Sequence, residues 1–173
     1  MLPDRIIRNG RVEPERWSFV GVEPEAAIQP LPEGPIAVPL ALWAAQRESL
    51  RARATPVGVW LKPEDEPAAL AGDVSHLRFV AVRFPKFTDG RGYSTASLLR
   101  RRYGYKGELR AFGDVGRDQL FYLERVGFDS FALAPHRDPE SALASFGDFS
   151  VRYQGSIDDP LPLFRRRTAG VAP

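Results

Sequence analysis

The chain has 173 residues, of which 43% are hydrophobic and 27% are charged, and its net charge is +2. This ordinary globular composition argues against wholesale disorder, and one hydrophobic core is the expected arrangement at this length. The chain contains no cysteine, which excludes disulfides, thiolate nucleophiles, zinc–thiolate sites and cysteine-ligated iron–sulfur clusters.

The chain also lacks the signals of two classes of partner. No apolar stretch approaches the roughly 20 residues that span a bilayer, and the first residues lack the apolar core of a signal peptide. We therefore expect a cytoplasmic protein with no membrane partner. Acidic and basic residues nearly cancel, and no basic stripe alternates with aromatic residues, so nucleic acid is not an expected partner.

Residues 1–35 differ from the rest of the chain in their proline content. Proline interrupts helices and most central strands, which argues against regular structure in this segment. Only residues 17–20, Trp-Ser-Phe-Val, have the apolar character of a buried strand or an anchor. We predict a proline-rich arm laid over the core, with prolines at Pro3, Pro14, Pro24, Pro30, Pro32 and Pro35.

Between residues 36 and 155, short apolar runs alternate with helical patterns. Helix-forming residues predict a helix over 39–52 and a short acidic helix over 64–71. Capping residues predict further helices that begin at Ser94, Asp114 and Asp138. The apolar runs predict strands at 57–61, 78–83, 108–112 and 130–133, and a last strand near 149–153.

This alternation is typical of successive βα units, which form parallel sheets with right-handed crossovers and both faces covered. We predict an α/β fold with about five mostly parallel strands, arranged as an open sheet or as a partial βα barrel. The whole chain, 1–173, is expected to be one domain, with an arm at 1–35, a core at 36–155 and a tail at 156–173.

The turn after the second predicted strand, at residues 89–94, is the first candidate site. Backbone N–H groups of Gly90 and Gly92, the following helix N-terminus, Ser94 and the guanidinium of Arg91 can converge on an anion such as phosphate, sulfate, sulfite or a carboxylate. A structural interpretation stays open. In it the glycines adopt left-handed dihedrals, Ser94 caps the helix and Arg91 pairs with Asp89.

The turn after the third predicted strand carries a second charged group. If the two strands are parallel neighbours, their C-terminal ends place Arg110, Arg117 and Asp118 near the first turn, on one rim. Three carboxylates, those of Asp89, Asp114 and Asp118, are then candidates for proton transfer. The same charges can instead form an ion-pair network that fixes the loops.

Other chemistries find less support in the sequence. His76 and His136 are the only histidines and lack metal-ligand spacing, so no metal site is predicted. Ser94, His136 and Asp114 can be written as a triad, but no nucleophile-elbow pattern accompanies them. The many aromatic residues fit a core, and phosphate-loop and dinucleotide fingerprints are absent. No cofactor is evident, although a flavin held without a recognisable motif stays open.

Several motifs together resemble a bacterial family, the domain of unknown function 934. The resemblance is densest over about 75–135, and its motifs are Phe87-x-Asp-Gly-Arg-Gly-Tyr-Ser94, Leu99-Arg100, Gly107-Glu-Leu-Arg-Ala111, Gly113-Asp114, Arg117-Asp-Gln-Leu120 and Arg125-x-Gly-Phe128. Members of this family are often described as probable oxidoreductases or as sulfite-reductase-associated proteins, with genes beside those of assimilatory sulfite reductase.

The resemblance implies a pathway more than a chemistry, and it leaves open whether the protein is an enzyme. It implies an accessory protein of assimilatory sulfate and sulfite reduction that binds sulfite reductase or a related enzyme. The alternative is a small enzyme or a sensor that binds an anionic sulfur or phosphate compound at the rim, through Arg91, Arg110 and Arg117.

Overall fold

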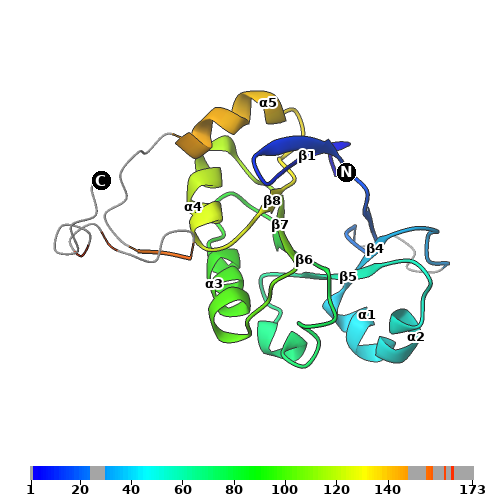
Figure 1. The fold of residues 1–173 in the computed structure, drawn as a ribbon. Helices are drawn as coiled ribbons and strands as arrows, with labels where there is room; N and C mark the ends of the chain where they lie inside the picture. The colour runs from blue at the N-terminus through cyan, green and yellow to red at the C-terminus, as the bar shows by residue number, and fades with distance from the viewer. Residues whose placement is uncertain (1, 24–29, 148–154, 158–161, 163–164, 166–173) are drawn as a thin grey trace.

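The computed structural model describes residues 2–23, 30–147, 155–157, 162 and 165. The strand predicted near 149–153 and most of the predicted tail lie outside these residues. The described part is a mixed α/β structure built on a curled, open sheet of eight strands (Figure 1). In chain order the strands are β1 Arg5–Arg8, β2 Arg11–Pro14, β3 Ser18–Phe19, β4 Ile36–Pro39, β5 Val57–Leu61, β6 Phe79–Phe84, β7 Glu108–Gly113 and β8 Ser130–Phe131.

The order across the sheet is β2-β1-β8-β7-β6-β5-β4-β3. From β3 to β8 each strand is parallel to the next one along the chain, whereas β1 is antiparallel to both β2 and β8. The mostly parallel α/β class predicted from the sequence is confirmed. Because consecutive strands are neighbours, the sheet curls in one direction, as in part of a βα barrel.

The predicted number of strands, about five, was too low. The proline-rich arm contributes β1, β2 and β3 to the sheet in addition to covering the core, and of these only β3 lies in the segment predicted as a strand or an anchor, 17–20. β4 was not predicted either. Its first two strands form a hairpin whose turn residues Asn9 and Gly10 both have positive φ, 48° and 71°. Such turns match the twist of antiparallel strands, and edge strands tolerate proline, so Pro14 ends β2 without disrupting the sheet.

Helical segments alternate with the strands from β4 onward. They are α1 Leu40–Ala45, α2 Arg47–Arg51, α3 Arg91–Ser97, α4 Leu120–Arg125 and α5 Pro139–Ala142, with 3₁₀ turns η1 Pro67–Leu70, η3 Arg117–Gln119 and η4 Leu143–Gly147, and a π-helical turn η2 Leu98–Arg102. Gln46 divides the single helix predicted over 39–52 into α1 and α2, and the helix predicted over 64–71 is η1.

Two of the predicted helix starts were wrong. Ser94 lies inside α3, which begins at Arg91 with Gly90 as its N-cap. Asp114 precedes η3 without capping it, since η3 begins at Arg117 after Gly116. The third start was correct, because the carboxylate of Asp138 accepts hydrogen bonds from the first backbone N–H groups of α5.

Separate hydrophobic clusters cover the two faces of the sheet. The helices lie along the outer face of the sheet (Figure 1). The larger cluster joins this face to them, and its members include Trp43 of α1, Leu99 of η2 and Leu123 of α4. On the inner face, Trp60, Phe79 and Phe112 pack against side chains of the arm. The helices therefore cover one face and the arm covers the other.

Candidate functional site

The C-terminal ends of β6 and β7 form the rim that the sequence predicted. These strands are parallel neighbours with Arg83 opposite Phe112 and Phe84 opposite Gly113. The loop after β6 carries Asp89, and the loop after β7 carries Asp114. Parallel strands end at the same edge of a sheet, so the two loops share one edge. We use "rim" below for residues 85–91 and 114–119.

In the first loop, charge is balanced locally. Arg91 donates hydrogen bonds from Nε and Nη2 to the two carboxylate oxygens of Asp89, at 3.0 and 2.7 Å. Its Nη2 also lies 3.1 Å from Oε1 of Glu64. These contacts hold the pKa of Asp89 below its usual range and raise the pKa of Arg91. Arg91 is therefore engaged by two carboxylates, as in the structural interpretation of this turn.

The glycines of this loop do not have the left-handed geometry predicted under the structural interpretation. Gly90 has a φ of −83°, and Gly92 lies within α3, so neither adopts a left-handed backbone conformation. Gly92 is buried against the ring of Phe84, and a methyl group there would overlap that ring, coming within 2.8 Å of its Cε1. Gly92 is thus required by packing between α3 and β6. Ser94 is exposed on α3.

In the second loop, polar groups link the two turns to each other. The carboxylate of Asp114 accepts a hydrogen bond from the backbone N–H of Phe87 at 2.9 Å. Gln119 accepts one from the N–H of Gly116 at 2.8 Å and donates one to the carbonyl of Phe87 at 3.2 Å. Arg117 and Asp118 are exposed in η3. Asp114 therefore fixes the relative position of the loops.

A small cleft lies beside this edge, at the mouth of the curled sheet. Its volume is about 210 Å³, and among the predicted site residues only Asp114 lines it. Arg83 also lines the cleft, with its Nη1 donating to the carbonyl of Val22 at 3.0 Å. The cleft holds one carboxylate and one guanidinium from the rim strands, each with a backbone partner.

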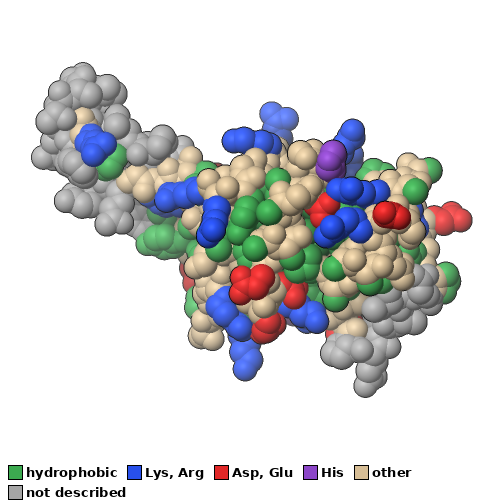
Figure 2. Space-filling model, turned by 90° about the horizontal axis from the view of Figure 1, so that it is seen from below, with side chains coloured by type: hydrophobic (Ala, Val, Ile, Leu, Met, Phe, Trp, Pro, Cys, Tyr) green, Lys and Arg blue, Asp and Glu red, His purple; other side chains and the backbone are tan. Residues whose placement is uncertain are grey.

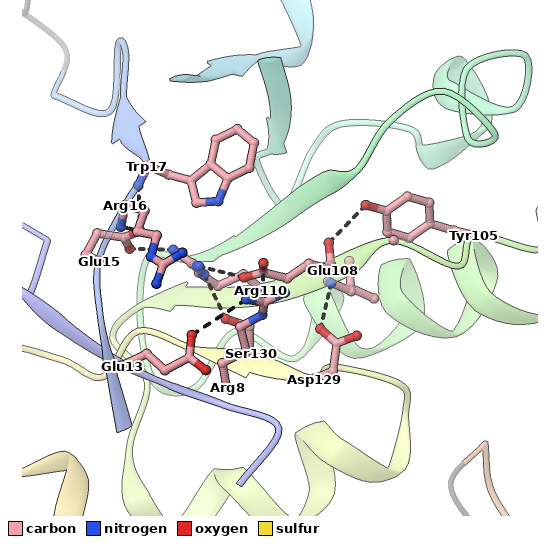
Figure 3. A network of polar contacts seen from close by, with 12 residues as sticks. Arg8, Glu13, Glu15, Arg16, Trp17, Tyr105, Glu108, Arg110, Asp129 and Ser130 are labelled. Atoms are coloured by element: carbon pink, nitrogen blue, oxygen red, sulfur yellow. Dashed lines mark hydrogen bonds and ion pairs between the residues drawn. The ribbon is translucent and has the colours of Figure 1, made fainter. Parts of the chain in front are cut away.

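Arg110 lies away from the rim, in the middle of β7 on the inner face, and it is only 1% exposed. It donates to Oγ of Ser130 at 2.9 Å, to Glu108 at 2.6 Å and to Glu15, as Figure 3 shows. Its guanidinium also lies 4.6 Å from the ring centroid of Phe79. Every part of this side chain has a partner, and Glu15 ties it to the arm.

Arg100, part of a motif quoted above, has a similar structural role. Its guanidinium donates to Asp129 and to the carbonyls of Tyr105, Gly107 and Gly127, at 2.8 to 2.9 Å. Asp129 in turn accepts a hydrogen bond from the N–H of Leu109. Burial raises the pKa of Asp129 despite these contacts. Arg100 therefore joins η2 to the loops that precede β7 and β8.

The two histidines lie in different loops. His76 precedes β6, at the N-terminal end of that strand, and His136 follows β8, so they do not share the rim. Within the described residues, no group of three or more histidine, aspartate or glutamate side chains is placed to hold a metal ion. No helix in that part of the chain has the length and apolar character needed to span a bilayer.

The motifs that make up the rim and its scaffold also identify the family. The family model "Bacterial protein of unknown function (DUF934)" matches residues 58–164, which is more than half of the chain. The chain belongs to the DUF934 family. Comparison of this DUF934 protein with curated proteins and with solved structures gives no match in either set.

Proposed function

We propose that this DUF934 protein is a cytoplasmic accessory protein of assimilatory sulfate and sulfite reduction, and that it binds sulfite reductase or another enzyme of that pathway. The pathway comes from the family resemblance. The binding role is supported by one observation on the rim. The side chains of Asp89, Arg91 and Asp114 are held by each other and by backbone groups, and of these three only Asp114 lines the cleft.

The surface around the rim is also suited to contact with another protein. Three large hydrophobic side chains are exposed in the described residues: Phe87 at 46%, Leu98 at 37% and Tyr122 at 54%. All three belong to the rim, α4 or the π-helical turn η2 that follows α3. Aromatic residues surrounded by polar ones are typical of interface centres.

The proposal predicts specific capture of a sulfate-assimilation enzyme. Tagged protein purified from its host grown on sulfate should carry a sulfite-reductase subunit, or another enzyme of the pathway, in near-stoichiometric amount by mass spectrometry. The double variant Phe87→Ser, Tyr122→Ser should lose that partner because it removes the exposed aromatic area. Ala41→Ser, an exposed substitution on α1, should retain it. Recovery of the wild-type protein alone would contradict the proposal.

The alternative is a small enzyme or sensor for an anionic sulfur or phosphate compound at the rim. One observation favours it, namely that Arg83 and Asp114 line the same cleft. Under this alternative, sulfite or phosphate should raise the melting temperature of the wild-type protein, and Arg83→Gln should abolish that rise. Equal melting temperatures with and without the anion would exclude the alternative.

A further inference from the structure

A second cavity lies at the other end of the strands. It has a volume of about 520 Å³ and lies where β5 and β6 begin, between the end of α2 and the loop before β6. This size is within the range of roughly 300–1,000 Å³ that is usual for small-molecule sites. We call it the basic pocket; its lining residues include Trp43, Leu50, Arg51, Arg53, Thr55, His76, Leu77 and Arg78.

The pocket is lined by three arginines and one histidine, and none of its lining residues is acidic. In the view from below, basic side chains gather beside a histidine (Figure 2). Three buried apolar side chains, those of Trp43, Leu50 and Leu77, form part of its wall. The cavity therefore combines cationic side chains with an apolar wall.

One of the three arginines is neutralised inside the protein. Arg51 pairs with Asp73, whose side chain is only 3% exposed. The same carboxylate accepts a hydrogen bond from Nε1 of Trp43 at 2.9 Å and lies 3.2 Å from Nε of Arg47. One carboxylate is thus shared by two guanidinium groups.

The charges of the other two arginines are not neutralised by any described residue. Arg53 donates only to neutral oxygens, the carbonyls of Pro32 and Gly34 and the hydroxyl of Thr55. Its Nε is buried and has no hydrogen-bond partner within the described residues. In that part of the chain, the Arg78 side chain makes no hydrogen bond or ion pair. A buried polar group without a partner, as at Nε of Arg53, is uncommon and points to a missing ligand or ion. Arg78 is exposed, so its guanidinium is accessible to such a ligand from solvent.

We propose that the basic pocket binds a small organic phosphate or sulfate. The oxyanion lies between Arg53 and Arg78, because a guanidinium fork matches the oxygens of such groups and forms charge-assisted hydrogen bonds with them. The organic part of the ligand packs against the apolar wall beside Trp43. This site is separate from the rim and from the partner surface proposed above, so either can exist without the other.

The test is calorimetric titration of the full chain at fixed ionic strength with phenyl phosphate, phenyl sulfate, inorganic phosphate and inorganic sulfate. We expect the preferred phenyl ester to bind at least about tenfold more tightly than its inorganic counterpart, because only the ester reaches the apolar wall. The two esters distinguish the oxyanions, since the phosphate carries the larger charge. Absence of binding by both esters would overturn the proposal.

Arg78→Gln gives the sharpest variant, because this side chain has no described partner to lose on substitution. The melting temperature should stay unchanged while the affinity for the ester falls by at least about tenfold. Arg11→Gln is the matched control: it removes the same charge from an exposed site on β2, at the opposite edge of the sheet. Equal loss of affinity in the two variants would show that the ester is attracted by the overall charge of the protein, and it would overturn the proposed site.

Amide and indole NMR signals locate the ligand independently. Binding in the basic pocket should shift the indole N–H signal of Trp43 and the backbone signals of residues 53–57 and 76–78. Shifts confined to residues 85–91 and 114–119 would place the anion at the rim instead and would overturn the proposal.

Discussion

The two ends of the parallel strands differ in the partners of their charged side chains. At the rim, Arg91 is held by Asp89 and Glu64, and the carboxylate of Asp114 is held by a backbone N–H. In the basic pocket, Arg53 and Arg78 have no carboxylate partner among the described residues. Arg83, Lys86 and Arg117 at the rim end also form no ion pair among the described residues, but the cleft there is lined by the acidic Glu23 and Asp114 as well. The rim contains the densest motifs of the sequence, yet the pocket that is lined by arginines and by no acidic residue lies at the other end.

This difference separates two uses of arginine. A guanidinium whose donors are all satisfied inside the protein holds loops and strands together, and an added anion gains little from it. A guanidinium that lines a cavity and pairs with no carboxylate keeps its charge for an anionic ligand. α/β folds usually bind ligands at the C-terminal ends of their strands. Here the positive charge at the N-terminal ends comes from side chains, so the usual preference does not decide the location.

Removal of a fully paired arginine should have the largest effect. Arg110→Met should lower the free energy of unfolding by about 3 kcal/mol, because it leaves the largely buried carboxylate of Glu15 without its cation. The loss is at the low end of the usual range because Arg8 still pairs with Glu108. Urea denaturation followed by tryptophan fluorescence measures it, with Arg11→Met as the exposed control. A loss below about 1 kcal/mol would mean that the ion pairs of Arg110 contribute little to the stability of the fold.

Asp73 neutralises Arg51, one of the three arginines that line the basic pocket. Asp73→Asn should lower the free energy of unfolding by about 1–3 kcal/mol, because an amide cannot satisfy Trp43 and both arginines together. It should also strengthen the binding of phenyl phosphate severalfold by releasing the charge of Arg51. Denaturation and calorimetry of the same sample test both effects. Weaker binding by the variant would show that Asp73 orients ligand-binding groups instead of competing for them.

The central strands were predictable because their sequences satisfy several local rules at once. The runs predicted at 57–61, 78–83 and 108–112 correspond to β5, β6 and β7 within one residue at each end. Each run combines β-branched or aromatic residues with turn residues on its flanks. Gly104 and Gly127 end helices with positive φ values of 67° and 107°, which glycine adopts without strain.

The arm was predicted, with β3 inside the apolar segment at 17–20, but its strands β1 and β2 were missed because proline was weighed without its position in the sheet. Proline excludes a central strand but not an edge strand, and the Asn9-Gly10 pair is itself a strong hairpin signal. Arg110 carried a signal too, since a lone arginine inside an apolar strand indicates a buried partner. The basic pocket carried none. Its arginines come from segments 25 residues apart, and only the fold shows which of them lack a carboxylate.

The smallest expected effect concerns the exposed pair of Asp89 and Arg91. Because Arg91 lowers the pKa of Asp89, the pair stabilises the folded state fully above the ordinary aspartate value of 3.8, and this contribution is lost as pH falls through the lowered folded-state value. Solvent screening keeps the contribution to stability slight. In Arg91→Gln the carboxyl ¹³C signal of Asp89 should titrate at higher pH, while the affinity for phenyl phosphate stays the same. An unchanged titration would mean that the charge of Arg91 is available to a ligand. Arg91 would then no longer differ from the arginines of the basic pocket.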